Sequence, residues 1–233
     1  MISIILPTYN EAGNIANLIN QISLILKKRQ YEIIVVDDNS PDKTWQIVQK
    51  LQKHDHRIKL FRRLHERGLT SAFNFGIQQS RGEVIGWMDA DLSMPPKYLT
   101  NMIKLIPEYD LVIGSRYVTG GHDQRENKLA VFLSLILNKT AGLFLGHSLT
   151  DYTSGYILSK KIVFNHYKLN GDYGEYCIDL LVNSLRRGFK IKEVPYDCVP
   201  REHGESKTAS NIFGFAKRGK KYLFTIIRLW LKK

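Results

Sequence analysis

The chain of 233 residues is poor in cysteine: it has two, Cys177 and Cys198, whose spacing matches no metal-ligand pattern. This excludes a disulfide scaffold and a zinc finger, and we expect both thiols to be reduced and partly buried in a cytosolic setting. Disulfides are also unnecessary here, because a chain of this length buries roughly 70 % or more of its unfolded surface.

Long hydrophobic runs are also missing. No apolar run reaches the ~20 residues that cross a bilayer, and the longest, 129–137, is followed by polar residues 138–140. We expect no signal peptide, because the first apolar stretch, residues 2–6, is followed at once by polar turn residues. The sequence therefore favours a protein that is soluble or lies on a membrane surface.

Negative charge is in short supply. The chain has 22 Asp and Glu against 34 Lys and Arg, a formal net charge of +12. Such an excess suggests a polyanionic partner, which could be nucleic acid, an anionic membrane or a phosphorylated small molecule. Basic clusters lie at 62–67, 184–190 and 217–221, but no zinc finger, helix-turn-helix or RNA-binding aromatic pattern accompanies them. The sequence therefore argues against nucleic acid.

The sequence does contain short β-rich apolar runs that alternate with helical patterns. We expect strands at 2–6, 32–36, 58–62, 83–88 and 110–114, and helices at 12–28, 44–53 and 69–80. The less regular second half predicts one or two helices at 128–146, a turn at 151–156, a helix at 175–188, a strand at 190–198 and a helix at 212–233. This alternation predicts an α/β fold with a mostly parallel central sheet and helices on both faces.

Polar, mostly acidic residues follow four of these strands, at 7–11, 37–42, 89–93 and 114–117. In parallel sheets, ligands bind beyond the carboxyl ends of the strands. Asp89 and Asp91 are two residues apart, so in an extended chain both carboxylates leave the same face. They would repel each other unless a cation lies beside them, and Mg²⁺ or Mn²⁺ holding a diphosphate fits that requirement. The alternative is a solvated acidic turn.

Six motifs in this chain form a familiar series: PTYNE (7–11), VVDDNSPD (35–42), MDADLSMPP (88–96), GSRY (114–117), DYTSGY (151–156) and REHGESK (201–207). In this order and spacing they resemble the family 2 glycosyltransferases, and within them the dolichol-phosphate mannose synthases, over residues 1–210. The resemblance implies a glycosyltransferase A-type fold, a nucleotide-diphospho-sugar donor, a divalent metal (Mg²⁺ or Mn²⁺), inversion at the anomeric carbon and a polyprenyl phosphate acceptor.

The resemblance also implies roles for individual residues. Those expected to contact the base and ribose of the donor are Pro7, Tyr9, Glu11, Val36 and Asp38. Those expected to hold the diphosphate and the metal are Asp89, Ala90 and Asp91, with Ser93 as a third metal ligand where many relatives carry glutamine. Arg201 and Lys207 would clamp the donor diphosphate, and Arg201 would act in catalysis together with Asp89 and Asp91.

Each of these side chains also has a structural interpretation. Tyr9 could pack under the sheet edge, Glu11 could favour the helix that begins at residue 12, and Asp38 could belong to a turn. The loop at 200–207 could be solvated. We assign Asp37 to structure rather than to a ligand.

The acceptor should need a cation rather than a base. A phosphate monoester has a second pKa of about 6 and is already largely dianionic at neutral pH. Arg116 with Ser115 is the candidate site, and the resemblance adds Ser134. Relatives usually carry an arginine one turn before this serine. Here residues 129–131 are Leu, Ala and Val, and Arg125 or Lys128 is the candidate substitute.

Two apolar stripes at helical spacing fit the lipid end of such an acceptor. The first is Leu129, Phe132, Leu133 and Ile136, and the second is Phe213, Phe215, Tyr222, Phe224 and Trp230 among Lys and Arg. The second resembles an interfacial helix. We therefore expect a catalytic domain at 1–210 and a basic amphipathic helix at 211–233, peripheral to the cytoplasmic side of an anionic membrane, with a small membrane-anchoring subunit as a candidate partner. Alternatively, both stripes pack on the catalytic core.

Three functions remain open at this point. The first is transfer of mannose from GDP-mannose to a polyprenyl or dolichyl phosphate. The second uses a UDP-sugar such as UDP-glucose, with a polyprenyl phosphate or a glycan hydroxyl as acceptor; a hydroxyl would require a base, for which Asp151 and Glu175 are candidates. The third is a non-catalytic nucleotide-binding subunit recruited to a membrane.

Overall fold

A seven-stranded sheet forms the centre of the protein. The structure, a computed structural model, describes residues 1–146, 149–203 and 212–232, the side chains of 212–217 excepted. The strand order is β3-β2-β1-β4-β7-β5-β8. Their bounds are β1 Ile2–Thr8, β2 Tyr31–Asp37, β3 Ile58–Arg62, β4 Val84–Trp87, β5 Leu111–Ser115, β7 Ile157–Lys160 and β8 Ile191–Pro195. β7 runs antiparallel to both of its neighbours, and the other pairs are parallel.

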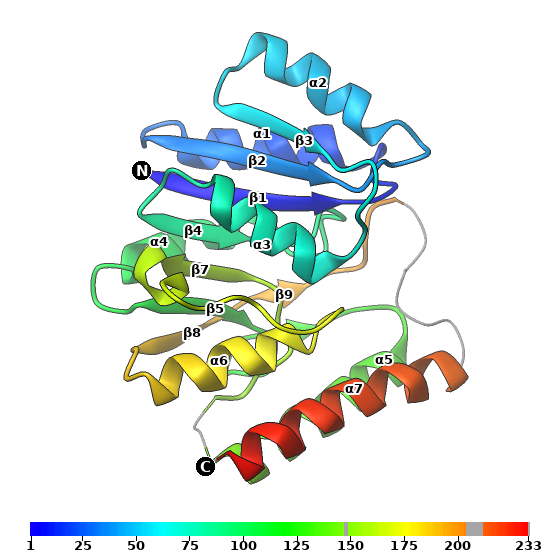
Figure 1. The fold of residues 1–233 in the computed structure, drawn as a ribbon, viewed down its shortest axis with the longest axis vertical. Helices are drawn as coiled ribbons and strands as arrows, with labels where there is room; N and C mark the ends of the chain where they lie inside the picture. Colours follow the sequence, from blue (N-terminus) through cyan, green and yellow to red (C-terminus); the bar gives the residue numbers. More distant parts are fainter. Residues whose placement is uncertain (147–148, 204–211, 233) are drawn as a thin grey trace.

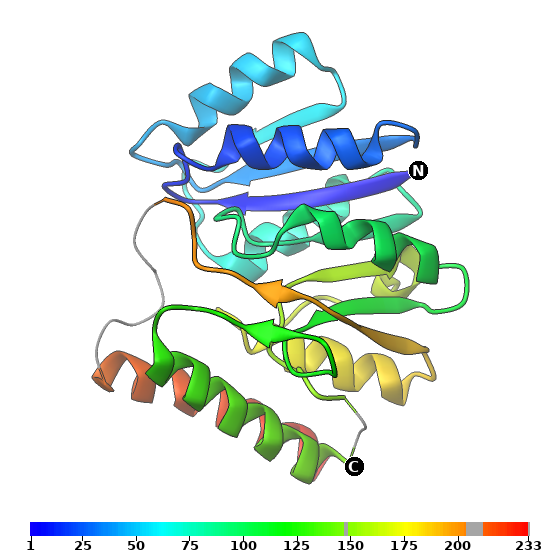
Figure 2. The same cartoon turned by 180° about the vertical axis from the view of Figure 1, so that it is seen from behind.

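Helices cover both faces of this sheet (Figures 1 and 2). One face carries α1 Ile15–Leu26, α2 Thr44–His54 and α4 Leu99–Leu105, and the other carries α3 Leu69–Gln79 and α6 Tyr176–Arg186. At the β8 end, α5 Lys128–Leu145 and α7 Ile212–Leu231 lie side by side, with Phe144 against Trp230 at a ring distance of 6.0 Å. The short elements are β6 His122–Asp123 paired with β9 Asp197–Cys198, and the 3₁₀ turns Pro96–Tyr98 and Lys161–Phe164.

The strands are apolar throughout because each one contributes to two cores. In β1, Ile4 and Leu6 belong to the cluster under α1, whereas Ile5 between them belongs to the cluster that contains Phe73 and Trp87. Successive side chains on a strand point to opposite faces, so a sheet covered on both sides needs an unbroken apolar run. The predicted α/β fold with a mostly parallel sheet is confirmed.

Two details were missed or left open by the sequence-based expectations. The antiparallel strand β7 was not predicted. The helix at 128–146 is one continuous helix, and among the described residues it is the one that is long and apolar enough, by length and composition, to cross a membrane. The expectation that no uninterrupted apolar run reaches about 20 residues is not contradicted, because this helix has 18 residues and polar residues 138–140 lie within it. Cys177 and Cys198 are both free and buried, as predicted.

The apolar stripes divide between core and surface. Leu129, Phe132, Leu133 and Ile136 are all exposed. In α7, Phe224 and Trp230 are exposed, but the Tyr222 ring packs inward against the core cluster that contains Phe73 and Trp87. Assigning Tyr222 to the same stripe as Phe224 was therefore wrong, whereas Phe213 and Phe215 have side chains outside the described set.

Candidate active site

A pocket of about 380 Å³ lies at the carboxyl ends of β1, β2 and β4. It is lined by Pro7, Thr8, Tyr9, Glu11, Asp38, Arg67, Gly68, Leu69, Ala72, Asp89, Ala90, Asp91, Asp172, Tyr173 and Arg201. Eight of the residues predicted to bind the donor are therefore brought together: Pro7, Tyr9, Glu11, Asp38, Asp89, Ala90, Asp91 and Arg201.

The other predicted donor and metal residues lie elsewhere. The Val36 side chain is fully buried in the core, which leaves only its backbone for any contact with a donor. Ser93 is half-buried beside the pocket, where its N–H donates to Asp91 Oδ1 (3.0 Å) and its carbonyl accepts from the Val199 N–H (3.1 Å). Lys207 lies outside the described residues.

Asp89 and Asp91 bring two carboxylates that repel each other to the lining of the pocket. Burial, followed by the neighbouring carboxylates of Asp91 and Glu11, raises the pKa of Asp89 to about 7, although Arg201 and Arg116 act in the opposite direction. Asp91 is compensated by an ion pair with Arg201, whose Nη2 lies 2.8 Å from its Oδ2. The site thus has an excess of negative charge centred on Asp89.

The excess of negative charge around Asp89 bears on the prediction that a divalent metal binds here. A divalent cation between the two carboxylates would relieve the repulsion that raises the Asp89 pKa. Within the described residues, no group of three or more His, Cys, Asp and Glu side chains is arranged to hold a metal. Mg²⁺ is commonly held by one or two carboxylates together with substrate phosphates, so the pair fits a metal that the donor diphosphate completes.

Asp37, the last residue of β2, and Asp38, the residue after it, shape the chain at the edge of the pocket. Asp37 accepts hydrogen bonds from Thr8 Oγ1 (2.8 Å) and from the N–H and hydroxyl of Ser40 (2.9 and 2.6 Å), which agrees with the structural role assigned to it. Asp38 binds Arg63 Nε (2.7 Å) and the Gly68 N–H (2.9 Å), and so fixes the loop between β3 and α3. Burial nevertheless raises the Asp38 pKa.

The position of Arg201 depends on contacts with the start of α1. Asn14 Nδ2 donates to Glu11 Oε2 (2.9 Å) and to the His203 carbonyl (3.2 Å), and so ties residues 201–203 to the first motif. A Cβ at Gly13 would lie 3.1 Å from the Cβ of His203, so a side chain there would crowd this junction. These contacts hold Arg201 beside Asp91.

Arg67, Asp172 and Tyr173 are pocket residues that the sequence reasoning missed. The Arg67 guanidinium lies 5.0 Å from the centre of the Tyr9 ring, at a distance typical of a cation–π pair. The basic cluster at 62–67 was the available signal for Arg67. Asp172 and Tyr173 lie in a loop before α6 for which the sequence carries no comparable signal.

A second polar cluster centres on the buried pair of Arg116 and Asp151. Asp151 is fully buried and accepts from the Arg116 N–H (3.0 Å), from Nε (2.8 Å) and from Nη2 (2.8 Å). It also accepts from the N–H and hydroxyl of Thr153, both at 3.2 Å. The Asp151 carboxylate raises the pKa of Arg116 well above its usual value despite burial.

The predicted acceptor residues meet at this cluster. Thr153 Oγ1 accepts from Arg116 Nη2 (2.7 Å) and lies 3.4 Å from Ser134 Oγ, which brings α5 to the arginine. Ser115 is buried, and its hydroxyl accepts from the N–H groups of Tyr117 and Val118 (3.3 and 3.1 Å). Arg116 and Ser134 are therefore neighbours through Thr153, whereas the Ser115 hydroxyl stabilises the turn at residues 115–118.

Arg125 joins the same cluster through Asp123. Its Nε and Nη2 donate to the Asp123 carboxylate (2.8 and 2.6 Å), which also accepts from the Tyr117 hydroxyl (2.9 Å) and lies 3.6 Å from Arg116 Nη1. Arg125 thus joins the cluster around Arg116, and Arg116 and Arg201 are positive groups that act on the pKa of Asp89. Arg125, one of the two suggested substitutes, therefore contacts this cluster through Asp123.

A model of the family described as "Glycosyl transferase family 2" matches residues 3–168. The chain belongs to this family. Over 210 residues it is 36 % identical to a dolichol-phosphate mannosyltransferase of Pyrococcus furiosus, covering 88 % of this chain and 58 % of that protein. It is 33 % identical over 219 residues to a polyprenol monophosphomannose synthase of Mycolicibacterium smegmatis, covering 90 % of this chain and 82 % of that protein. The chain thus spans little more than half the length of the Pyrococcus relative.

Solved structures agree on the fold. Glucosyl-3-phosphoglycerate synthase from Mycobacterium tuberculosis, solved with Mn²⁺, UDP and phosphoglyceric acid, superimposes with a TM-score of 0.71 at 17 % identity over 99 % of this chain and 78 % of that one. The same protein with Mg²⁺ and UDP gives 0.69 at 16 % identity, over 98 % and 79 % of the two chains. The predicted glycosyltransferase A-type fold is therefore confirmed. The predicted membership of the family 2 glycosyltransferases is confirmed by the family model and by the two relatives.

Proposed function

We propose that this glycosyltransferase moves mannose from GDP-mannose to a polyprenyl or dolichyl monophosphate, with inversion, at the cytoplasmic surface of a membrane. The relatives named for this reaction support the proposal. The pocket at the strand ends would take the nucleotide sugar, and the cluster around Arg116 would take the acceptor phosphate.

The observation that carries the proposal is the engagement of Asp151. A glycan hydroxyl needs a general base within reach, and Asp151 was a candidate. Its carboxylate is fully buried and already accepts five hydrogen bonds from Arg116 and Thr153. Glu175, the other candidate, is buried and binds the Asp172 N–H (2.9 Å). Only one Glu175 oxygen is engaged in this way, since its Oε2 is buried without a hydrogen-bond partner among the described residues. Asp151 is therefore the carboxylate whose engagement speaks against a base, and an ionised phosphate needs no base.

The chemistry then follows from charge placement. An acceptor phosphate oxygen forms a bond to the anomeric carbon while the bond from that carbon to the donor diphosphate breaks and GDP leaves. Arg201, held at the pocket by Asp91, faces the negative charge that grows on the leaving diphosphate. Arg116, with its orientation fixed by Asp151, positions the acceptor. Asp89 and Asp91 would hold a divalent cation that supplies positive charge to the diphosphate.

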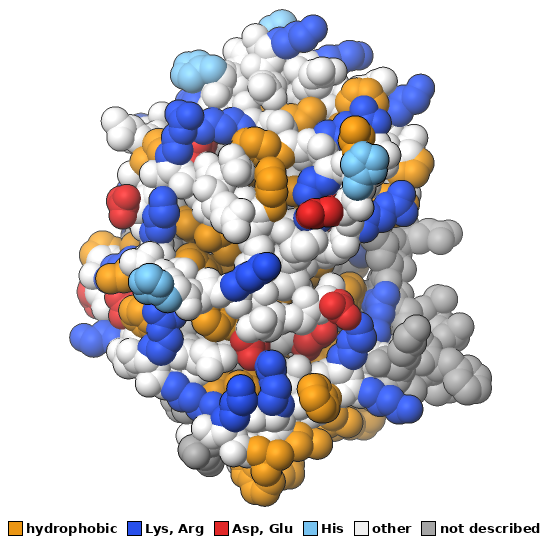
Figure 3. Space-filling model, viewed as in Figure 1, with side chains coloured by type: hydrophobic (Ala, Val, Ile, Leu, Met, Phe, Trp, Pro, Cys, Tyr) orange, Lys and Arg blue, Asp and Glu red, His pale blue; other side chains and the backbone are white. Residues whose placement is uncertain are grey.

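Exposed apolar side chains support the membrane part of the proposal. Leu129, Phe132 and Ile136 of α5 are 45–58 % exposed, and Phe224, Ile227 and Trp230 of α7 are 44–68 % exposed. Figure 3 shows hydrophobic side chains at the lower end of the molecule, where Figure 1 has α7, with Lys and Arg side chains just above them. Such an arrangement suits an anionic headgroup layer.

α5 is better suited to lie on the membrane than to cross it. Asn138 on its inward side donates to Thr153 Oγ1 (3.0 Å) and accepts from the Tyr152 N–H (2.6 Å), while Ala141 and Leu145 are buried in the core. Crossing would break these contacts and separate Ser134 from Arg116. Contact through the exposed side alone keeps the acceptor cluster intact.

A donor and acceptor screen tests the function. GDP-mannose and UDP-glucose are each supplied with Mg²⁺ or Mn²⁺ and with either a short polyprenyl phosphate or a mannose oligosaccharide, and products are identified by mass. We expect mannosyl phosphopolyprenol. Preference for UDP-glucose, or transfer to the oligosaccharide, would favour the UDP-sugar alternatives. Nucleotide binding without transfer or donor hydrolysis would favour a non-catalytic subunit.

Membrane contact is tested by sedimentation with phosphatidylglycerol vesicles. Phe224→Asp should reduce vesicle binding, whereas Leu24→Asp on α1 should not, although the two side chains are similarly exposed at 68 % and 66 %. Equal loss in both variants would point to nonspecific charge repulsion, and no loss in either would rule out α7 as the contact surface.

A further inference from the structure

The inward face of α7 contacts the loop that closes the donor pocket. Arg218, Lys221 and Tyr222 are spaced i, i+3 and i+4, so they project from one side of the helix. Each contacts a different residue of the loop Asp172–Gly174. Two of these loop residues, Asp172 and Tyr173, line the same pocket as the strand ends and Arg201.

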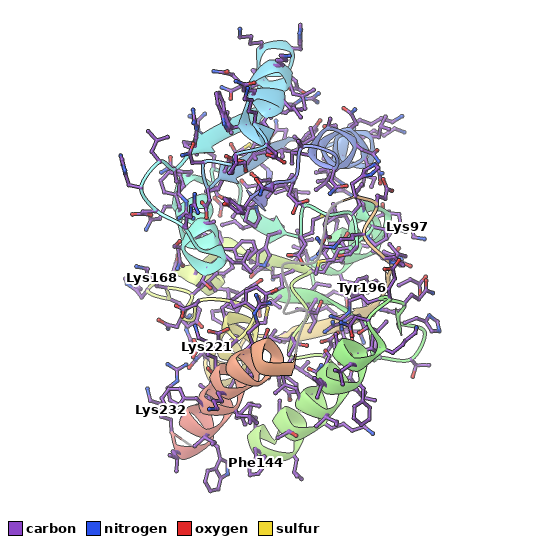
Figure 4. All side chains as sticks on the ribbon, turned by 90° about the vertical axis from the view of Figure 1, so that its right-hand side faces the viewer. Lys97, Phe144, Lys168, Tyr196, Lys221 and Lys232 are labelled. Atoms are coloured by element: carbon purple, nitrogen blue, oxygen red, sulfur yellow. The ribbon has the colours of Figure 1, made fainter. Side chains whose placement is uncertain are left out.

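The three contacts are of different kinds. Lys221 Nζ forms an ion pair with Asp172. The Arg218 guanidinium lies 4.2 Å from the centre of the Tyr173 ring. The Tyr222 ring packs against Gly174 so closely that a Cβ at Gly174 would overlap the Tyr222 hydroxyl and would lie 3.2 Å from Cζ. Figure 4 shows Lys221 on α7 close to the body of the protein, away from the free end of the helix near Lys232.

The loop is held both by the protein body and by α7. From α3, Thr70 Oγ1 reaches the Tyr173 carbonyl at 3.5 Å, the upper limit of a hydrogen bond. Glu175 at the start of α6 accepts from the Asp172 N–H (2.9 Å). These bonds hold the loop backbone at two points, and α7 adds an ion pair to the Asp172 side chain and a cation–π contact to the face of the Tyr173 ring.

We propose that α7 is part of the donor site: Arg218, Lys221 and Tyr222 are positioning residues that hold Tyr173 and Asp172 against the bound nucleotide sugar. The proposal rests on the proposed function, because it assumes that the donor occupies this pocket. Donor affinity then depends on helix residues that do not line the pocket. Small displacements of a pocket wall can lower rates up to about a hundredfold without any change in the reacting groups.

The decisive experiment introduces a steric clash between residue 174 and Tyr222 and then relieves it with a second substitution. Gly174→Ala adds a methyl group where the Tyr222 hydroxyl lies, so the loop must move away from α7. Tyr222→Phe removes the hydroxyl and leaves a 3.2 Å contact that a small shift can relieve. We expect Gly174→Ala to weaken binding of GDP with Mn²⁺ and to raise the donor KM, each about tenfold, with an unchanged acceptor KM. Combined with Tyr222→Phe, it should return to within about twofold of the wild type.

A charge change provides a second arm. Lys221→Met should raise the donor KM, whereas Lys220→Met, which removes the same charge from the exposed neighbouring residue, should not. The Lys221–Asp172 pair is largely exposed (42 % and 78 %), so its loss should barely change the melting temperature. A rise in donor KM without loss of stability would therefore reflect positioning.

The outcomes separate the two proposals. If the wild-type protein binds neither GDP nor UDP with Mn²⁺, the proposed function fails. If it binds GDP and Gly174→Ala binds it equally well, this inference fails. It also fails if the affinity loss in Gly174→Ala persists in the double variant, because the contact with Tyr222 would then not be its cause.

Discussion

Replacing Asp151 by asparagine separates a structural carboxylate from a catalytic base. The amide keeps the size of the side chain but removes its charge and turns one acceptor atom into a donor. Asp151 Oδ2 now accepts from the Arg116 N–H and Nε, so an amide nitrogen there would face two donors. With the amide reversed, the same conflict would arise at Oδ1, which accepts from Arg116 Nη2 and from Thr153.

The expected cost is large because the pair is buried, with side-chain exposures of 7 % for Arg116 and 0 % for Asp151. Removing one partner of a buried ion pair usually costs about 3–5 kcal/mol. For a protein of this size each kcal/mol corresponds to about 2–4 °C, so the melting temperature should fall by roughly 6–20 °C. Asp55→Asn is the control, since its pair with Arg57 is more exposed, at 22 % and 42 %, and should cost at most about 1 kcal/mol.

The assay combines thermal unfolding with single-turnover transfer to polyprenyl phosphate, measured well below the melting temperature of the variant. We expect Asp151→Asn to keep measurable transfer, because Arg116 retains its charge although its orientation is weakened. The rate should still rise with pH through about 6, following the second ionisation of the acceptor. If the variant unfolds like the wild type, binds GDP normally and has lost transfer, Asp151 is a base and the phosphate acceptor must be abandoned.

Three further predictions follow from charges and surfaces. Because the folded-state pKa of Asp89 is raised to about 7 from a usual 3.8, the metal-free protein should lose stability as pH rises from about 4 to 7. In chelator, the melting temperature of Asp89→Asn should fall less steeply with pH than that of the wild type, and equal slopes in both proteins would contradict the prediction. Asp38→Asn removes the buried charged partner of Arg63 and leaves it Glu66, Ser71 and the Gly68 carbonyl, so it should lower stability by up to about 3 kcal/mol and weaken GDP binding; calorimetry showing unchanged binding would separate the loop at 63–68 from the donor site. Phosphatidylglycerol vesicles should lower the donor KM of the wild type but not of Gly174→Ala, since the outward face of α7 meets lipid while its inward face holds the loop; an equal response in both would refute this link.

The sequence predicted the pocket because the strands that build it have a clear signal. β1, β2 and β4 are buried on both faces, so they are unbroken apolar runs, and the polar residues after them had to lie at one edge of the sheet. β7 lacked that signal. It has four residues, two of them Ser159 and Lys160, and is held between β4 and β5 by pairing that local sequence does not encode.

Long-range partners account for the remaining differences. Residues 138–140 suggested a break in the helix at 128–146, but Asn138 is satisfied by the loop at 151–153 and the helix continues. Asp151 was a candidate base because the sequence gives no sign that Arg116, 35 residues earlier, occupies it. In both places a polar side chain has a partner distant in sequence, and that partner decides what the side chain does.

The two faces of α7 show where sequence reasoning could have gone further and where it had to stop. Residues two positions apart on a helix point about 200° apart, so Tyr222 and Phe224 could not share a face, and helical geometry alone would have excluded one of them from a membrane-facing stripe. The contact of Tyr222 could not be predicted from the sequence, because its partner Gly174 has no side chain. Gly174 matters because it lacks a Cβ, which would overlap the Tyr222 hydroxyl. A glycine before a helix predicts a turn in many proteins. Only the packing of Tyr222 shows that this one allows a surface helix to reach the wall of the donor pocket.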